Sequence, residues 1–573
     1  MTEAATTQQT DWSLRPWVLA ALLGVADFLV WFFTDVPHGE FVPWRAAAGA
    51  FVFFGCGALA FTIDPKEWQR PLLFSLLVGL VMAGIAWRAQ SAGDHYTDAG
   101  YWMAAGVVSV VLAIPLFQSH FYKLLWRTPY EETHFHVWTD AISAAGALAF
   151  FLLSLLLAYL LSELFATIDI TLLRELLRDD WFTATFAGVT FGAALGVLRN
   201  QLKIIGTLQS VVMLVFSLIA VPFAAALVVF ILAVLVSGLD VLWGATRSPT
   251  PLLLSCAAAS FVLVNSVVRN GDSEASGSRV MRWAALVLAL GILPLAIMAA
   301  ASTGTRIAEY GLSPERIWGL VAIVVAVAYG VAYFVAPIRG RMAHWMDRVR
   351  TANLHLAIGT CILAFLLALP ILDFGAISAR DQLARLEAGK VEVEDFDFTA
   401  LRWDFGDAGR EALERLTRSD DDKVAELANA AQLQDSRPYY GRRDSSEDRD
   451  ERLANLRMQF ENEKLERQVE LHVRNTPWRC DDPCVVLDYG LLDNGRHMTI
   501  FVEDGRVDFE GFRLEQAEPK GDAEAIALAV ETAEAPGLRQ PSPEQDAKSQ
   551  VEIREWTGRR VYIDGKPAGD PFE

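Results

Sequence analysis

The hydrophobic residues of this chain lie in long blocks between Trp17 and Phe374, and the chain becomes polar after that point. A helix that crosses a hydrocarbon core of about 30 Å needs about 20 mainly apolar residues. Lipid offers backbone amides no partner outside a helix or a closed barrel. The pattern therefore predicts a polytopic helical membrane domain with about eleven spans. The predicted blocks are 17–33, 44–63, 72–87, 101–117, 141–164, 181–198, 205–239, 252–268, 283–302, 317–336 and 354–374.

The seventh block, 205–239, is longer than a bilayer requires, because a helix rises about 1.5 Å per residue. It contains Pro222, so it is either one kinked helix or two short spans. Lys and Arg concentrate in cytoplasmic segments. With a cytoplasmic N-terminus, eleven spans place 14 of these residues inside and 7 outside, whereas a split block gives 10 and 11. This asymmetry favours eleven spans and a C-terminal region outside the cytoplasm.

The region after the last block is acidic. Residues 375–573 contain 45 Asp and Glu against 28 Lys and Arg, and residues 1–374 contain 24 against 21, so the net charges of −17 and −3 add to −20. An acidic appendage argues against a nucleic-acid partner, because phosphate binding needs a basic face. The expected regions are a cytoplasmic tail (1–16), a transmembrane domain (17–374), an acidic helical extracytoplasmic region (375–475) and a β-rich extracytoplasmic region (476–573) with a linker around 516–550.

The polar region carries its own periodic patterns. From Ser378 onward, apolar residues at helical spacing predict three short helices, and the highly charged stretch 445–474 predicts one longer helix. Alternating residues around Asp504-Gly505 predict a β-hairpin, and a similar pattern recurs near the C-terminus. The predicted fold class is an all-α transmembrane bundle followed by a small α+β soluble domain.

Cys480 and Cys484 are separated by three residues in the β-rich region. In an oxidising compartment such a pair is expected to form a disulfide. A zinc site normally needs four ligands, and only His472 and His497 lie nearby. A redox-active pair usually reads C-x-x-C beside a βαβ unit, which the predicted elements do not include. We therefore expect a disulfide, and we predict no metal and no cofactor.

Three glycines, Gly188, Gly192 and Gly196, share one face of the sixth span. Glycines at this spacing let a neighbouring helix approach closely, so a packing role is favoured over a moving transport seam. Asp27 is the only carboxylate well inside a predicted block, and a charge there is costly unless it is paired or hydrated. It is either a proton or cation site or a capped, water-exposed residue. Asn265 is expected to form a hydrogen bond between helices.

The stretch "YGLSPERIW" leads into the tenth span. Ser313 can cap the helix N-terminus, and Pro314 suits its first position. Tyr310 and Arg316 are candidate functional residues at the membrane interface. Arg316 is unexpected near the positive end of a helix dipole, and a carboxylate or a lipid phosphate would explain it.

Together, "YGLSPERIW" and the stretch "ARLEAGKVEVEDFDFTALRWDFGDAGREALERL" resemble a family of bacterial polytopic membrane proteins, the domain-of-unknown-function 4153 type. The resemblance covers most of the membrane domain and the start of the polar region. It implies a bacterial inner membrane, with a periplasm or the cell exterior on the other side. The family has no established chemistry, so the resemblance implies no catalytic residue.

The sequence contains no nucleophile elbow, P-loop, dinucleotide fingerprint or H-E-x-x-H motif. The leading hypothesis is a non-enzymatic envelope protein that presents an acidic extracytoplasmic domain for binding or sensing. Its expected partners are the lipid bilayer and an envelope protein or a small molecule. One alternative is an ion- or proton-coupled transporter or channel that uses Asp27. Another is a membrane enzyme that acts on lipid-linked or phosphate-bearing envelope precursors through Arg316.

Overall fold

The structure is a computed structural model that divides into two compact units, Met1–Asp435 and Ser436–Glu573. The boundary expected between residues 475 and 476 lies inside the second unit. The described residues are 12–35, 42–238, 249–271, 274–340, 344–434, 437, 452–460, 462–476, 479–491, 497–503, 506–512, 551–555, 559–563 and 566–572.

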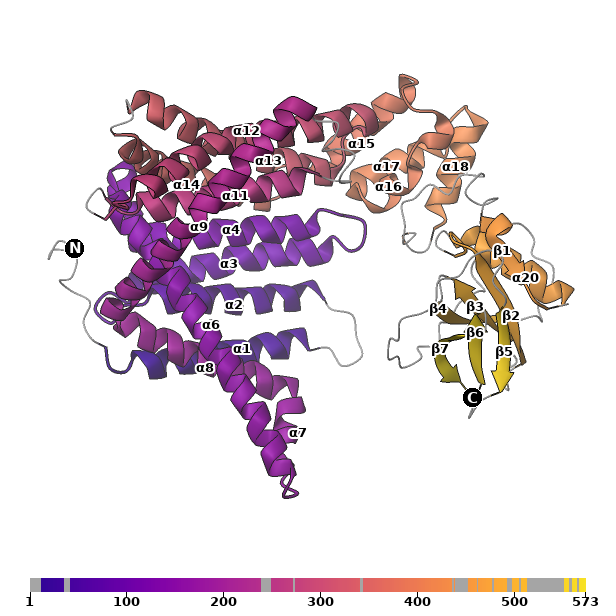
Figure 1. The fold of residues 1–573 in the computed structure, drawn as a ribbon, viewed down its shortest axis with the longest axis horizontal. Helices are drawn as coiled ribbons and strands as arrows, with labels where there is room; N and C mark the ends of the chain where they lie inside the picture. The colour runs from indigo at the N-terminus through magenta and orange to yellow at the C-terminus, as the bar shows by residue number, and fades with distance from the viewer. Residues whose placement is uncertain are drawn as a thin grey trace. The chain divides into compact units, whose positions relative to one another are not determined.

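The described part of the first unit contains eleven helices that are long and apolar enough to cross a membrane, which confirms the predicted bundle (Figure 1). These helices are α1 (Arg15–Thr34), α2 (Pro43–Thr62), α3 (Gln69–Ser91), α4 (Ala99–Gln118), α6 (Tyr130–Ala166), α8 (Asp180–Asn200), α9 (Leu202–Ser237), α11 (Pro249–Val268), α12 (Arg279–Tyr310), α13 (Pro314–Arg339) and α14 (Trp345–Ala368). Short elements α5 (Phe121–Leu124), η1 (Leu125–Arg127) and α7 (Leu172–Arg178) lie between them. The architecture is that of a multi-pass membrane protein.

Two of the long helices settle questions of span boundaries. The seventh block forms the single helix α9, which has 36 residues and contains Pro222, so the prediction of one helix rather than two is confirmed. Helix α6 has 37 residues and begins eleven residues before the predicted block. Its first turn contains Glu131 and Glu132, whose negative charge suits the positive end of the helix dipole. Polar residues before position 141 therefore belong to the spanning helix.

The apolar interior of the bundle consists of several clusters. The largest joins α9, α11, α12, α13 and α14. A second cluster joins α3 and α4 with residues of α13 and α14, and a third joins α1, α2, α6 and α8. Figure 1 shows α1, α2, α3 and α4 side by side, in agreement with their contacts. Large apolar side chains elsewhere on these helices are exposed in the protein and are available to lipid.

The chain continues from α14 into a group of short helices that we call the cap. It comprises α15 (Phe374–Glu387), η2 (Val393–Asp395), α16 (Phe398–Trp403), α17 (Gly406–Leu416) and α18 (Asp422–Gln432). Helices α15, α16 and α18 begin with an Asp whose side chain accepts a backbone amide, as an N-cap does. The cap has its own apolar core, centred on Leu401 and Leu413. It has four α-helices where three were predicted.

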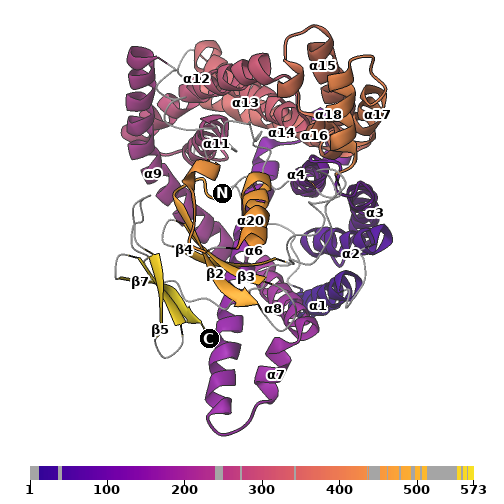
Figure 2. The same ribbon diagram turned by 90° about the vertical axis from the view of Figure 1, so that its right-hand side faces the viewer.

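The second unit contains a four-stranded sheet with the order β1-β2-β3-β4 (Figure 2). Its elements are β1 (Leu456–Met458), α20 (Glu463–Asn475), β2 (Cys484–Leu491), β3 (His497–Glu503) and β4 (Arg506–Phe512). Strands β1 and β2 are parallel, and the other pairs are antiparallel. The predicted hairpin is present, because Glu503 pairs with Arg506 across the two-residue connection.

The segment β1–α20–β2 is a βαβ unit, which corrects two expectations. The stretch 445–474 does not form one helix, because β1 interrupts it, and a βαβ unit does adjoin the cysteine pair. Helix α20 buries Leu465, Val469 and Val473 against the sheet. Three further strands, β5 (Val551–Glu555), β6 (Arg559–Ile563) and β7 (Lys566–Phe572), form a separate sheet. The linker expected around 516–550 lies outside the described residues.

Candidate functional site

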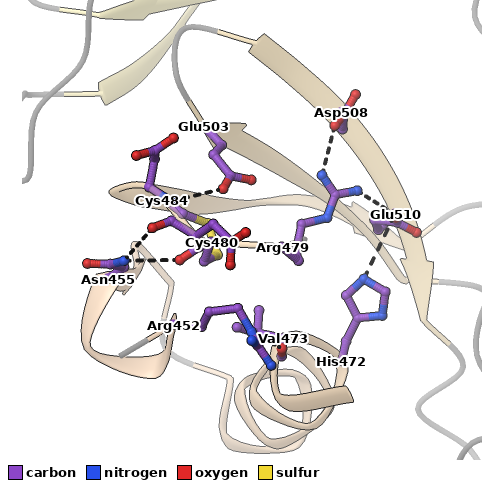
Figure 3. The surroundings of a disulfide bond; sticks show 12 residues. Arg452, Asn455, His472, Val473, Arg479, Cys480, Cys484, Glu503, Asp508 and Glu510 are labelled. Carbon is purple, nitrogen blue, oxygen red and sulfur yellow. Dashed lines mark hydrogen bonds and ion pairs between the residues drawn. A yellow bond between two sulfur atoms is a disulfide. The ribbon is translucent and has the colours of Figure 1, made fainter. Parts of the chain in front are cut away.

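The cysteine pair lies at the start of β2, where the chain returns from α20 to the sheet. Cys480 and Cys484 form a disulfide, with their Cα atoms 5.0 Å apart. Cys480 is 0% exposed and Cys484 is 1% exposed, so the bond lies inside the second unit (Figure 3). Cys480 has a φ of 63°, a left-handed conformation that residues other than glycine seldom adopt. The disulfide therefore closes a tight loop whose two cysteines are buried and whose intervening residues Asp481 and Asp482 are exposed.

Side chains from two other segments bind the loop (Figure 3). The side-chain amide of Asn455 donates to the carbonyl oxygens of Cys480 at 3.1 Å and Asp481 at 3.0 Å. The carboxylate of Glu503 accepts the backbone N–H of Asp482 at 3.3 Å and also that of Cys480. Burial nevertheless raises the pKa of Glu503 above its ordinary value. The loop is thus fixed by polar contacts as well as by the covalent bond.

Arg479, immediately before the disulfide, connects the loop to β4. Its Nη1 donates to Asp508 at 2.7 Å and its Nη2 to Glu510 at 2.6 Å. The guanidinium also lies over the ring of Phe501. Burial lowers the pKa of Arg479, but the hydrogen bonds and charges of the two carboxylates together raise it above the ordinary value. The site therefore contains a buried ion pair between Arg479 and Glu510.

His472 on α20 faces the carboxylate of Glu510. Its Nε2 lies 3.9 Å from Oε1 of Glu510, and its ring contacts those of Phe501 and Phe512. Burial lowers the pKa of His472, which favours the neutral imidazole. The other nearby histidine, His497, instead contacts Asp488 at 2.6 Å. Among the described residues no group of three or more His, Cys, Asp or Glu side chains could hold a metal ion.

In the membrane bundle, the three glycines of α8 face α1. A Cβ atom on Gly188 would lie 2.2 Å from the carbonyl oxygen of Leu23. The corresponding atom on Gly192 would lie 2.3 Å from the carbonyl oxygen of Leu19, and that on Gly196 would lie 2.5 Å from Cα of Pro16. The two backbones are therefore in direct contact along three turns, which is the packing that glycine permits.

Asp27 of α1 lies at this helix crossing. Its Oδ2 is 2.8 Å from the point that a Cβ on Gly188 would occupy. Cys56 of α2 is near enough to interact electrostatically with the carboxylate. The structure thus places Asp27 between three spanning helices, with part of its side chain still exposed.

A second carboxylate lies inside a span, and the sequence patterns missed it. Asp140 directly precedes the fifth predicted block, and it enters the bundle because α6 begins at Tyr130. It interacts electrostatically with the buried Arg199 of α8. Arg15 of α1 donates to the carbonyl oxygen of Arg199 at 3.0 Å and to Oδ1 of Asn200 at 2.9 Å. A longer helical pattern through residues 130–140 is the signal that could have identified this cluster.

Asn265 belongs to a closed ring of buried hydrogen bonds between three spanning helices, as its position predicted. Its side-chain NH₂ donates to Tyr333 Oη at 2.7 Å, and that hydroxyl donates to Oδ1 of Asn353 at 2.7 Å. The side-chain NH₂ of Asn353 donates back to Oδ1 of Asn265 at 2.7 Å. The ring connects α11, α13 and α14 and satisfies polar groups that would be costly in an apolar interior.

Tyr310 and Arg316 lie at the turn between α12 and α13. Nη1 of Arg316 donates to the carbonyl oxygens of Tyr310 at 3.2 Å and Gly311 at 2.7 Å. Carbonyl groups of its own turn, rather than a carboxylate, therefore bind this guanidinium. Ser313 caps α13 as predicted, since its hydroxyl accepts the backbone N–H of Arg316. Tyr310 is exposed, and its ring lies against the guanidinium.

The same turn is bound by the cap. Gln382 of α15 donates to the carbonyl oxygens of Tyr310 and Leu312, both at 2.9 Å. Asp381 accepts the backbone N–H of Leu312 at 2.8 Å. Arg385 donates to the carbonyl oxygens of Ala308 and Glu309. Side chains of α15 thus bind main-chain atoms at the C-terminal end of α12 and in the turn before α13.

A second turn, between α3 and α4, binds the cap at Gly406. The backbone N–H of Gly406 donates to the carbonyl oxygen of His95 at 2.8 Å. The φ of Gly406 is +64°, and a Cβ there would lie 2.1 Å from the ring of Tyr96. Asp98, buried below this turn, accepts the indole N–H groups of Trp102 at 3.1 Å and Trp318 at 3.2 Å. Burial raises the pKa of Asp98.

Comparison with known proteins identifies a matching family model. The model of a family described as "Domain of unknown function (DUF4153)" matches residues 48–416. This range begins inside α2 and ends at the last residue of α17, so it includes most of the bundle and most of the cap. Comparisons with curated proteins and with solved structures find no match.

Proposed function

We propose a function from this chain's own structure, because the chain belongs to the DUF4153 family, whose domain is of unknown function. The protein is a non-enzymatic component of a bacterial inner membrane. Its helical bundle anchors an acidic, disulfide-closed domain outside the cytoplasm, and that domain binds or senses a component of the envelope.

The disulfide between Cys480 and Cys484 is the observation that carries this proposal. Disulfides persist in oxidising compartments and are rare in the cytosol. The number of candidate spans is eleven, so a cytoplasmic N-terminus requires the chain after α14 to lie on the far side of the membrane. The distribution of Lys and Arg supports the same orientation, with 14 inside and 7 outside. Redox chemistry and charge asymmetry are independent arguments, and both support an extracytoplasmic second unit.

The contacts of the cap support a sensing role. The cap binds the α3–α4 turn at His95 and the α12–α13 turn at Leu312. Because these bonds go to main-chain atoms, a displacement of the cap changes the ends of four spanning helices together. A partner that binds the cap itself thereby acts on the bundle.

The partner is expected to carry positive charge. Residues 375–573 have a net charge of −17. Complementary potentials speed encounter and favour partners of opposite sign. A basic envelope protein or a small molecule that carries amines fits this chemistry, and binding is expected to weaken as salt is added.

Orientation is tested with two single-cysteine reporters and a membrane-impermeant maleimide applied to spheroplasts. Leu491 is 69% exposed on the second unit, and Glu67 is exposed between α2 and α3. We expect Leu491→Cys to react in intact spheroplasts and Glu67→Cys to react only after lysis. If Leu491→Cys reacted only after lysis, the second unit would be cytoplasmic and the proposal would be overturned.

Binding is tested by removing the second unit. A chain that ends at Gln434 keeps the bundle and the cap, and its membrane insertion serves as the control. Full-length protein in lipid nanodiscs is expected to bind a basic polypeptide such as polylysine more tightly than the shortened chain does. Equal binding by both chains, together with an unchanged cell phenotype, would remove the basis for a binding role of the second unit.

A transporter or channel is the second candidate function. The observation that favours it is the set of buried polar groups inside the bundle, namely Asp140 with Arg199 and the ring around Asn265. Flux measured in proteoliposomes, with Asp140→Asn as the test variant, distinguishes this candidate from a purely anchoring bundle. The enzyme alternative lacks comparable support, because Arg316 binds the carbonyl groups of its own turn.

A further inference from the structure

Asp27 is placed where two spanning helices touch. Its Oδ2 is 2.8 Å from the point that a Cβ on Gly188 would occupy. The carbonyl oxygen of Leu23, one turn earlier in α1, is 2.2 Å from the same point. Two oxygens of α1 therefore face the bare backbone of α8. A methyl group does not fit between the helices here, so a hydrated cation does not fit on this side of the carboxyl group either.

In the described part of the bundle, no neighbouring charge compensates Asp27. Within the described ranges, no hydrogen bond or ion pair reaches its carboxylate. The titratable group that faces it from α2 is the thiol of Cys56, and Gly188 on α8 has no side chain. The only other charged residue of α1 is Arg15, twelve residues away, or about 18 Å along the helix.

The charged residues of the two adjoining helices also lie near helix ends. In α2 the only one is Arg45, which donates to the carbonyl oxygens of Phe32 and Asp35. In α8 they are Asp180 at the first position and Arg199 in the last turn. Among the residues that the structure describes, the segment of the bundle around Asp27 therefore contains no cation that would keep the carboxylate ionised.

An ionised carboxylate at this depth is costly, and protonation removes the charge. The protonated group also gains a donor, and the Leu23 carbonyl is an acceptor on the same side of the helix. We propose that Asp27 is a proton-binding site at the α1–α8 crossing, occupied when the helices are packed together and emptied when they separate. This inference does not depend on the proposed envelope function.

The proposal links proton binding to helix packing. Loss of the proton leaves a negative charge against the backbone of Gly188, with the Leu23 carbonyl dipole beside it and no donor nearby. The two helices then separate until water reaches the carboxylate. Proton release and opening of the α1–α8 crossing are therefore one event.

The first test uses a hydrophobic carbodiimide, which reacts with protonated carboxyl groups in apolar surroundings. Full-length protein in lipid vesicles is treated over a range of pH, and the modified peptide is identified by mass spectrometry. We expect an adduct on Asp27 that decreases as pH rises and that is absent in Asp27→Asn. Asp140→Asn is the matched control. Asp140 interacts with Arg199 rather than with Asp27, so this variant is expected to keep the adduct on Asp27.

The second test measures thermal stability in detergent against pH. Asn cannot lose a proton, so Asp27→Asn mimics the protonated group. As pH rises, the thermal stability of this variant is expected to fall less than that of the native chain. A folded protein without an adduct on Asp27 at any pH would overturn the proposal. An adduct that does not change with pH, or identical stability profiles for Asp27→Asn and the native chain, would overturn it as well.

Discussion

Gly192→Ala tests the close crossing of α1 and α8. The added Cβ would lie 2.3 Å from the carbonyl oxygen of Leu19, 2.7 Å from its carbonyl carbon and 3.0 Å from Cα of Ala20. All three are backbone atoms of α1, so no side-chain rotation relieves the overlap. The helices must move apart by about 1 Å to reach ordinary contact distances near 3.5 Å, and the contacts at Gly188 and Gly196 loosen with them.

The magnitude follows from two opposing terms. Overpacking of a close-packed interior costs about 1–3 kcal/mol, and the rigid backbone contact favours the upper half of that range. Alanine is a better helix former than glycine by about 1 kcal/mol. We therefore expect Gly192→Ala to destabilise the protein by about 1–2 kcal/mol. Gly84→Ala is the matched control, because nothing lies within 4 Å of a Cβ there, and it should gain up to about 1 kcal/mol.

The assay is thermal unfolding of the full-length protein in mild detergent, followed by the loss of the monodisperse species. Both variants make the same chemical change in a spanning helix, so their difference isolates the contact with α1. We expect Gly192→Ala to unfold at a clearly lower temperature than Gly84→Ala. Equal unfolding temperatures would refute the direct backbone contact between α1 and α8.

Three further predictions concern the second unit, whose stability in the full chain is measured by pulse proteolysis in urea. Arg479→Met leaves Glu510 buried without its cation, so we expect the free energy of unfolding to fall by about 3 kcal/mol. Arg506→Met, at an exposed position, is the control, and equal urea midpoints for the two variants would contradict this expectation. Reduction of the disulfide frees a very short loop, and about 2 kcal/mol of stability should be lost on loop-entropy grounds; an unchanged midpoint would show that packing alone fixes the loop. Burial lowers the pKa of His472, so the neutral imidazole contributes to the free energy of unfolding above about pH 6.5, the ordinary pKa of histidine. That contribution is lost as the pH falls below this value. His472→Gln should remove that acid-dependent loss, and identical pH profiles would contradict the assignment.

The number of spans was predictable because it depends on composition over long windows. A block of about 20 apolar residues has one stable state in lipid, whatever its neighbours are. The long helix α9 illustrates this, since Pro222 did not divide it. The hairpin at Glu503 and Arg506 was also predictable, because a two-residue turn and alternating residues act locally.

The candidate site was only partly predictable. The spacing of Cys480 and Cys484 indicated a short closed loop, but Arg479 gave no signal in the sequence. Its carboxylate partners lie about 30 residues away on β4, and only the pairing of β3 with β4 brings them to the loop. Asp140 was missed for a different reason, because the apolar block that marks its helix begins one residue later.

The amino-acid sequence alone is enough to predict how many times this chain can cross a membrane, which glycines share a helix face, and where the acidic region begins. Each of these properties depends on residues that are close together along the chain. The folded protein is needed to show that β1 interrupts a strongly helical stretch, that Arg316 binds its own turn, and that Asp27 faces Gly188. Those outcomes depend on contacts between segments far apart in the sequence, whose energies local propensity does not contain.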